Sequence, residues 1–152
     1  PDVAGLLSPT PLIPGLDGRK MSKSYGNAIS ISMTPEETAR LIRKSKTDSE
    51  RTITFDPENR PGVSALLTTA GICTNRDPAD IAAEIGGGGA GQLKQYVTQA
   101  VNDCFAPIRE RRHQYEGDLD YVRDVIHDGN RRANEIATRT LDEVREVMGM
   151  VY

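Results

Sequence analysis

The chain has 152 residues, enough for one domain of ordinary size or for two small ones. Hydrophobic residues make up 37% of the chain and charged residues 27%. No apolar run approaches the roughly 20 residues that a membrane-spanning helix needs. We therefore expect a folded protein that is not embedded in a membrane.

The net charge of −3 conceals an uneven distribution along the chain. Between residues 19 and 46, seven Lys and Arg stand against two Glu, which gives this segment +5 and leaves −8 for the remainder. An acidic average predicts no general affinity for nucleic acid and no binding of DNA. Positive charge is instead concentrated near the N-terminal end.

The cysteines and the start of the chain carry two further expectations. Cys73 and Cys104 have no CxxC spacing and no neighbouring histidine pair, which argues against a disulfide scaffold and a metal site. A reducing, cytoplasmic location fits best. The chain opens on Pro1 with no initiator Met or targeting segment, so we expect it to be the interior of a longer polypeptide.

Residues 1–33 are rich in Pro, Gly and Ser and are typical of loops. Short apolar patches predict one or two brief strands within this segment. These patches are Leu6-Leu7, Leu12-Ile13 and Ile29 to Met33.

A helix is predicted from Thr34 to about Lys46. Thr34 is a typical N-cap, Pro35 fits the first helical position, and Glu37 completes a capping box. Three basic residues at helical spacing then share one face. They are Arg40, Arg43 and Lys44.

The next segment, residues 47–62, is predicted to be a turn-rich connector around a short strand, Thr52 to Phe55. A buried helix is expected over residues 63–74. Asp77-Pro78 then predicts the start of a helix that ends near Ile85.

The rest of the chain is expected to be helical after a glycine-rich loop, residues 86–91. A long helix begins at Gln92, and Pro107 should kink it without ending it. A last helical region, residues 119–148, should break at Gly129 and be capped by Gly149. Helical periodicity places the following residues in one shared core: Leu93, Val97, Ala100, Cys104 and Ile136.

The residues best suited to chemistry are two lysines on a glycine-flanked loop. Lys20 and Lys23 are three residues apart and alternate with the hydroxyl groups of Ser22 and Ser24. Such a loop could hold a polyphosphate and neutralise charge that develops on a leaving pyrophosphate, with no need for a nucleophile. The alternative is an ordinary solvated basic loop.

The five residues Lys20-Met21-Ser22-Lys23-Ser24 resemble the KMSKS motif of class I aminoacyl-tRNA synthetases. Three later stretches are similar, in the same order, to the C-terminal part of bacterial tryptophanyl-tRNA synthetases. They are KTDS at 46–49, RPGVSALL at 60–67 and ANEIATRTLDEVREVMG at 133–149. Several independent matches in one order favour the functional interpretation of the loop.

The resemblance implies a two-step enzyme that forms tryptophanyl-adenylate from tryptophan and ATP and then charges a tRNA. Mg²⁺ is expected to accompany the ATP. By the same resemblance, Lys20 and Lys23 would hold the ATP phosphates in the transition state. Ser22 and Ser24 would shape the loop, and Met21 would anchor it by packing.

The resemblance also implies the fold class, which is mainly α: a helical bundle of the anticodon-binding type after an irregular remnant of an α/β Rossmann-type catalytic domain. The corresponding domains are 1–33 with the KMSKS loop, 34–62 as a connecting helix and turns, and 63–152 as the tRNA-binding part. In this family the nucleotide fold and tryptophan pocket precede the KMSKS loop. Because those parts are absent here, we expect the isolated fragment to be inactive. The resemblance also implies a homodimeric full-length parent.

The tRNA contacts are less well defined by the sequence. Arg131, Arg132 and Arg139 could bind tRNA phosphates or form a solvated helix face. Two other identities stay open: another class I synthetase such as the tyrosyl type, and a stand-alone helical RNA-binding module. A pure RNA-binding module has no use for a pyrophosphate-binding loop, so the complete KMSKS motif favours the enzyme.

Overall fold

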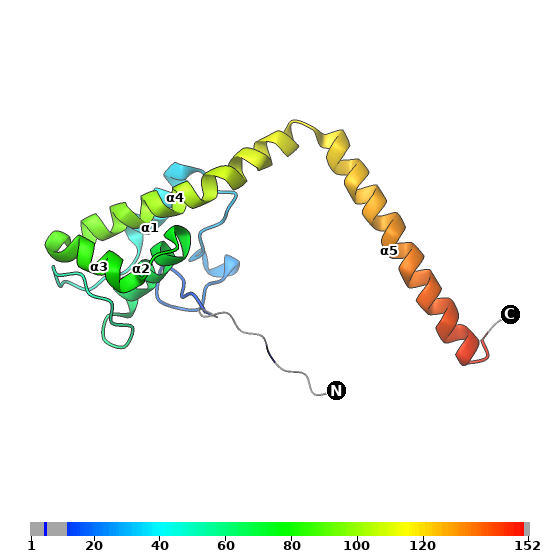
Figure 1. Cartoon of the computed structure of the whole chain (residues 1–152), viewed down its shortest axis with the longest axis horizontal. Helices are drawn as coiled ribbons and strands as arrows, with labels where there is room; N and C mark the ends of the chain where they lie inside the picture. Colours follow the sequence, from blue (N-terminus) through cyan, green and yellow to red (C-terminus); the bar gives the residue numbers. More distant parts are fainter. Residues whose placement is uncertain (1–4, 6–11, 151–152) are drawn as a thin grey trace. The chain divides into compact units, whose positions relative to one another are not determined.

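The computed structural model describes residue 5 and residues 12–150. These residues form two compact units, of which the first extends to Arg109 and the second begins at Glu110. The elements in chain order are η1 (Lys23–Tyr25), α1 (Pro35–Lys44), α2 (Pro61–Thr74), α3 (Pro78–Ile85), η2 (Gly86–Gly88), α4 (Gly89–Glu116) and α5 (Leu119–Val147), where η denotes a 3-10 helix (Figure 1).

The expectation of a mainly helical chain is confirmed, whereas the expected strands are wrong for the described residues. Their only β pairing is an isolated antiparallel bridge between Pro14 and Lys20. The stretch Thr52 to Phe55 forms no strand because its polar backbone groups bond elsewhere: Ile53 donates to the carbonyl of Gly86 (2.8 Å). Residues 12–13 and 29–33 likewise form no strand, and Leu6-Leu7 lies outside the described residues.

The two predicted helix starts are confirmed in detail. Thr34 Oγ1 accepts from the Glu37 amide (3.2 Å), and Glu37 Oε2 accepts from the Thr34 amide (2.9 Å). Asp77 caps α3 by accepting from the Ala79 amide (2.7 Å). α1 ends at Lys44, slightly before the expected residue, because Ser45 turns away and donates its hydroxyl back to the carbonyl of Ile42 (2.6 Å).

The glycine-rich segment 86–91 is not the predicted loop. It forms a 3-10 turn and the first residues of α4. Two distant groups hold the turn in place: the Ile53 amide donates to the Gly86 carbonyl (2.8 Å), and Arg51 Nε donates to the Gly87 carbonyl (3.1 Å). Tertiary hydrogen bonds therefore offset the low helical propensity of glycine.

In the first unit, α1, α2 and α3 pack against the N-terminal part of α4 (Figure 1). Leu93, Val97 and Ala100 of α4 are buried as predicted, and Cys104 is half-buried. The core cluster consists of Ile42, Ile53, Val63, Leu66, Leu67, Ala70, Ile81, Ala82, Ile85, Leu93, Val97, Ala100 and Val101.

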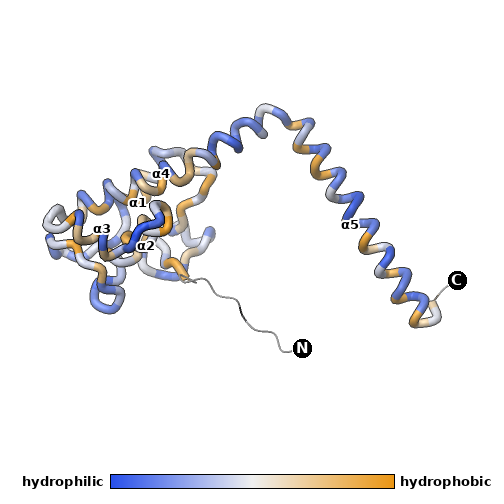
Figure 2. Tube along the Cα trace, in the orientation of Figure 1, coloured by the Kyte–Doolittle hydropathy of each residue, from blue (hydrophilic) through white to orange (hydrophobic). Residues whose placement is uncertain are grey.

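Helix α5 in the second unit differs from the prediction in two respects. It runs without a break through Gly129, and Ile136, expected in the core, is 59% exposed. Apolar and polar residues alternate along the whole helix, yet none of its residues is buried (Figure 2). Periodicity thus identified a helix with an apolar face, but not a partner for that face.

Two predicted features of the long helices are confirmed. Pro107 does not end α4, which continues to Glu116, and the kink at Pro107 stays a prediction. After α5, Gly149 adopts a φ of 66° and donates its amide to Glu146, while Met150 donates to Arg145, which is a Schellman motif. No helix in the described part of the chain is long and apolar enough to cross a membrane.

A buried arginine organises the connector before α2. Arg60 is only 6% exposed, and its guanidinium donates to both carboxylate oxygens of Asp48 (2.8 and 2.6 Å). It also donates to the Thr52 carbonyl (2.6 Å) and to Thr54 Oγ1 (2.9 Å). The hydrogen bonds that Arg60 donates to Asp48 hold the pKa of that carboxyl group below its usual value. One side chain therefore ties together a segment that has no regular secondary structure.

We predict that Arg60→Ala lowers the free energy of unfolding by about 2–4 kcal/mol, because it leaves the Thr52 and Thr54 oxygens without their donor. Urea unfolding followed by circular dichroism measures this change. Arg112→Ala is a matched control, since Arg112 also pairs with a carboxylate but is half exposed. It should leave the stability nearly unchanged. Equal losses in the two variants would contradict the role of Arg60.

Candidate functional site

The segment that carries the two candidate lysines is a compact loop. The Gly15 amide donates to the Arg19 carbonyl (2.7 Å), and the Gly18 amide donates to the Gly15 carbonyl (2.8 Å). Gly18 has a φ of 82°, a conformation that favours glycine. The chain thus reverses at Asp17-Gly18, and Lys20 pairs with Pro14 across the turn.

The loop is built around the side-chain amide of Asn27, which is 4% exposed. Asn27 Nδ2 donates to Asp17 Oδ1 (2.8 Å) and to the Lys20 carbonyl (3.1 Å), and its Oδ1 accepts from the Ser22 amide (2.8 Å). A Cβ atom on Gly15 would lie 2.3 Å from Asn27 Nδ2, so only glycine allows this approach. One buried side chain therefore fixes the backbone on both sides of Met21.

Asp17 shares in this network as an ionised carboxylate. The hydrogen bond from Asn27, followed by those from the Arg19 side chain (2.7 Å) and amide (3.0 Å), lowers the pKa of Asp17 to about 2. Because the folded-state pKa is depressed, this contribution to loop order is complete above the ordinary pKa near 4. It is lost as the pH falls through about 2.

Lys20 and Lys23 both point into solvent, and neither forms an ion pair within the described residues. Lys23 begins the 3-10 helix η1, which ends at Gly26 with a φ of 62°. Ser22 Oγ and Ser24 Oγ lie 2.8 Å apart and bond to each other. The structure therefore presents two unpaired cations on an ordered backbone, an arrangement that can bind a phosphate-rich anion.

The motif's other predicted residue, Met21, is 37% exposed. Its anchoring role stays a prediction. Tyr25, next to the motif, lies with its ring 5.1 Å from the Arg19 guanidinium carbon.

Backbone hydrogen bonds attach the loop to the helices of the first unit. The Leu16 amide donates to the Asn27 carbonyl (3.0 Å), and the Lys46 amide donates to the Leu16 carbonyl (3.2 Å). Gly62 packs closely against this junction, since a Cβ atom there would lie 2.5 Å from the Lys46 carbonyl oxygen. The loop is therefore joined to the end of α1 and the start of α2.

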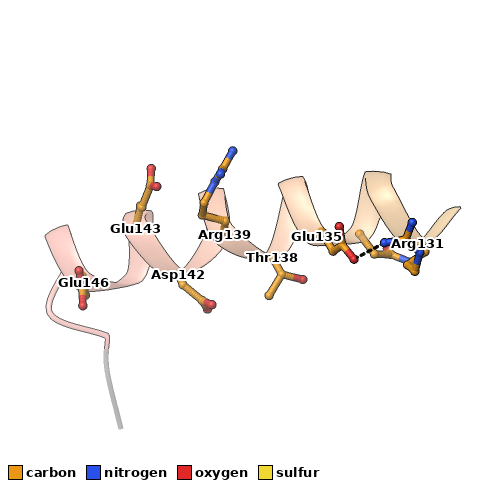
Figure 3. Close-up of a pocket in the computed structure, with 8 residues that line it drawn as sticks. Arg131, Glu135, Thr138, Arg139, Asp142, Glu143 and Glu146 are labelled. Atoms are coloured by element: carbon orange, nitrogen blue, oxygen red, sulfur yellow. Dashed lines mark hydrogen bonds and ion pairs between the residues drawn. The ribbon is translucent and has the colours of Figure 1, made fainter. Parts of the chain in front are cut away.

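The three arginines proposed for tRNA lie on α5 and differ in their surroundings. Arg131 pairs with Asp128 (2.6 Å) and Glu135 (2.7 Å), and Arg132 lies 3.9 Å from Asp128. Arg139 makes no ion pair within the part of the chain that the structure describes, and it projects freely from the helix (Figure 3). The structure thus places all three on one helix but leaves only Arg139 without a carboxylate partner.

The other reactive groups of residues 12–150 do not assemble into a second catalytic site. Among the described residues, no group of three or more His, Cys, Asp or Glu could hold a metal ion. Burial, together with the neighbouring Cys104, raises the pKa of the Cys73 thiol to about 12. A thiol in that state is a poor nucleophile at neutral pH.

Sequence reasoning missed the residues that shape the loop. Asp17 and Asn27 flank the motif, and neither was predicted to be a site residue. Their hydrogen bonds join residues 5–10 positions apart within irregular backbone, where no periodic pattern exists. Buried amides need partners, but a sequence does not say which ones.

Comparisons with known proteins agree on one family. The sequence profile of the class I tRNA synthetases (W and Y) matches residues 1–106. The tryptophan–tRNA ligase of Aquifex aeolicus is 34% identical over 154 residues, covering 99% of this chain and 39% of that protein. The corresponding ligase of Thermotoga maritima is 31% identical, covering 100% of this chain and 47% of that protein.

A solved structure supports the same relationship. Tryptophanyl-tRNA synthetase from Campylobacter jejuni, in complex with ADP and tryptophan, is 26% identical and superimposes with a TM-score of 0.73. The match covers 91% of this chain and 43% of that one. The chain therefore spans somewhat less than half the length of the relatives that it matches.

We predict that Asn27→Ala raises the pKa of Asp17 from about 2 toward the ordinary 3.8, because the Asn27 hydrogen bond is the main cause of the lowering. Carbon-detected NMR titration of the carboxyl groups measures this shift. Asp56, whose pKa is lowered chiefly by Asn59, is an internal control and should not move. An unchanged Asp17 midpoint in the variant would show that Asn27 does not hold the carboxylate.

Proposed function

We propose that this chain, which belongs to the class I tRNA synthetases (W and Y), serves as the KMSKS-loop and helical part of a tryptophan–tRNA ligase. In the first step, a carboxylate oxygen of tryptophan attacks the α-phosphorus of ATP, and the bond to the β-phosphate oxygen breaks to release pyrophosphate. In the second step, a terminal ribose hydroxyl of tRNA attacks the aminoacyl carbonyl and AMP leaves.

The observation that carries this proposal is the pair of unpaired lysines on the Asn27-ordered loop. Negative charge builds up on the departing pyrophosphate, and cations fixed in advance stabilise it without reorganisation. Lys20 and Lys23 fill this role, since no carboxylate within the described residues neutralises them. Ser22 and Ser24 shape the loop between the two lysines.

The proposed substrates are ATP and tryptophan, and the Campylobacter jejuni relative binds ADP and tryptophan. Mg²⁺ would arrive bound to the ATP phosphates, which is its usual mode in such sites. The described residues offer no carboxylate cluster that would bind it independently.

The proposed domain assignment keeps residues 1–33 as the end of a Rossmann-type catalytic domain, 34–62 as a connector and 63–152 as the tRNA-binding part. The proposed partner is tRNA, with Arg139 as the α5 arginine best placed to meet a phosphate. Arg131 and Arg132 would have to give up their ion pairs with carboxylates before they could bind a phosphate. The full-length protein is proposed to be a homodimer located in the cytoplasm.

The alternative enzyme is the tyrosyl type, because the matched family includes both amino acids. The named relatives described above are all tryptophan enzymes, which supports tryptophan. A stand-alone RNA-binding module is less well supported, because it would leave the ordered lysine loop without a use.

In the complete gene product, we predict that Lys23→Ala slows adenylate formation by a factor equivalent to about 2–4 kcal/mol, the usual effect of losing one preorganised donor to a developing anion. Tryptophan-dependent exchange of pyrophosphate into ATP measures this rate, and the Km for ATP should change less. Arg123→Ala, which removes an exposed cation from α5, is the control. Exchange by Lys23→Ala within threefold of the wild type would exclude the proposed role.

A further inference from the structure

The surface cations of this chain fall into two classes that the sequence does not separate. On α5, Arg123 pairs with Asp120 (2.9 Å), Arg131 with Asp128 (2.6 Å), and Arg145 with Asp142 (3.6 Å). Each pair joins residues three apart on the same helix, so the positive charge is largely neutralised in place. A phosphate that approached these arginines would have to compete with a carboxylate.

Helix α1 carries the opposite arrangement. Arg40, Arg43 and Lys44 are all exposed, and none forms an ion pair within the described residues. They lie on the face of the helix opposite the buried Thr38 and Ile42. The three charges therefore point into solvent together and belong to the segment with a net charge of +5.

This cationic face borders a groove between α1 and the N-terminal part of α4, and all residues that line the groove belong to the first unit. The groove has a volume of about 350 Å³. Its lining contains two cations and several neutral hydrogen-bonding groups but no carboxylate. The lining residues are Ala39, Arg43, Gly91, Lys94, Gln95, Thr98 and Gln99.

Hydrogen bonds hold the two walls of the groove together. Lys94 Nζ donates to the carbonyls of Arg43 (3.1 Å) and Ser45 (2.8 Å), where a positive charge also suits the C-terminal end of α1. Farther along, Arg109 Nη2 donates to the buried Thr38 Oγ1 (2.9 Å). The backbone that carries the cations of α1 is therefore fixed, and only their exposed side chains have to be ordered when they bind a ligand.

We propose that this surface, formed by Arg40, Arg43 and Lys44 and by the groove beside them, binds the phosphate backbone of RNA. Unpaired cations with a clear path to solvent can neutralise phosphates and release their counterions. Gln95, Thr98 and Gln99 add neutral groups suited to phosphate oxygens and ribose hydroxyls. The near absence of large apolar side chains from the surface argues against a membrane or a hydrophobic protein partner.

The identity of the RNA as tRNA rests on the proposed function. The surface is a second contact, separate from Lys20 and Lys23 and from the arginines of α5. It therefore supplies affinity for the tRNA body and takes no part in adenylate formation.

The test measures the affinity of the complete gene product for a tRNA(Trp) transcript at several salt concentrations by filter binding. The triple variant R40Q/R43Q/K44Q should bind about tenfold more weakly near 0.1 M salt. Its plot of log affinity against log salt should be flatter by about 2, since each lost phosphate contact removes somewhat less than one unit of slope. Tryptophan-dependent pyrophosphate exchange should stay within twofold of the wild type.

The matched control is R112Q/R123Q/R145Q, which removes the same net charge from arginines that are paired with carboxylates. It should change tRNA affinity by less than about threefold. The charge-conserving variant R40K/R43K/K44R should bind like the wild type, because phosphate contacts depend on charge more than on shape.

Equal weakening by the two triple Gln variants, or none in the α1 variant, would overturn the proposal while leaving the exchange activity intact. If the wild-type protein showed no tryptophan-dependent exchange, that result would instead contradict the proposed enzymatic function. Circular dichroism checks that the α1 variant keeps its helices. If it does not, the single variants Arg40→Gln and Lys44→Gln replace it, and each should flatten the slope by about 0.7–0.9.

Discussion

The buried amide of Asn27 is the interaction on which the candidate site depends. It satisfies three polar partners, the Asp17 carboxylate, the Lys20 carbonyl and the Ser22 amide, within a segment that has almost no regular structure. A neutral side chain can be buried at low cost once its hydrogen bonds are made. Burying the charged ammonium group of a lysine in the same place would cost much more free energy. The neutral Asn27 therefore orders the loop from inside, while Lys20 and Lys23 stay exposed to solvent and can bind an anion.

The two units also differ in whether their exposed cations are paired with carboxylates. In the first, the buried Arg60 and the helix-capping Lys94 hold the backbone in place. The exposed cations of α1 and the two motif lysines, Lys20 and Lys23, form no ion pair within the described residues. In the second, most of the described arginines on α5 face carboxylates along their own helix. Overall net charge hides this contrast, because pairing, and not the number of cations, decides which surface can attract a polyanion.

The sequence predicted local features well and distant contacts poorly. The starts of α1 and α3 were readable because Thr34 and Asp77 act on amides within three residues. Ile136 was wrongly placed in the core because an apolar helix face does not show which element, if any, packs against it. The break predicted at Gly129 was also wrong, since one glycine within a helix costs only about 1 kcal/mol of helix stability. The motif lysines were found from the sequence, but the role of Asn27 depends on tertiary geometry.

We propose that the lysine loop belongs to a tryptophan-activating enzyme, and the amino-acid dependence of ATP–pyrophosphate exchange in the complete gene product provides the decisive test. We expect rapid exchange with tryptophan and exchange near background with tyrosine, at equal concentrations and with Mg²⁺ present. Exchange that depended on tyrosine would move the chain to the other branch of its family. Absence of exchange with either amino acid, in a preparation that is folded and binds tRNA, would contradict the enzymatic role of the loop.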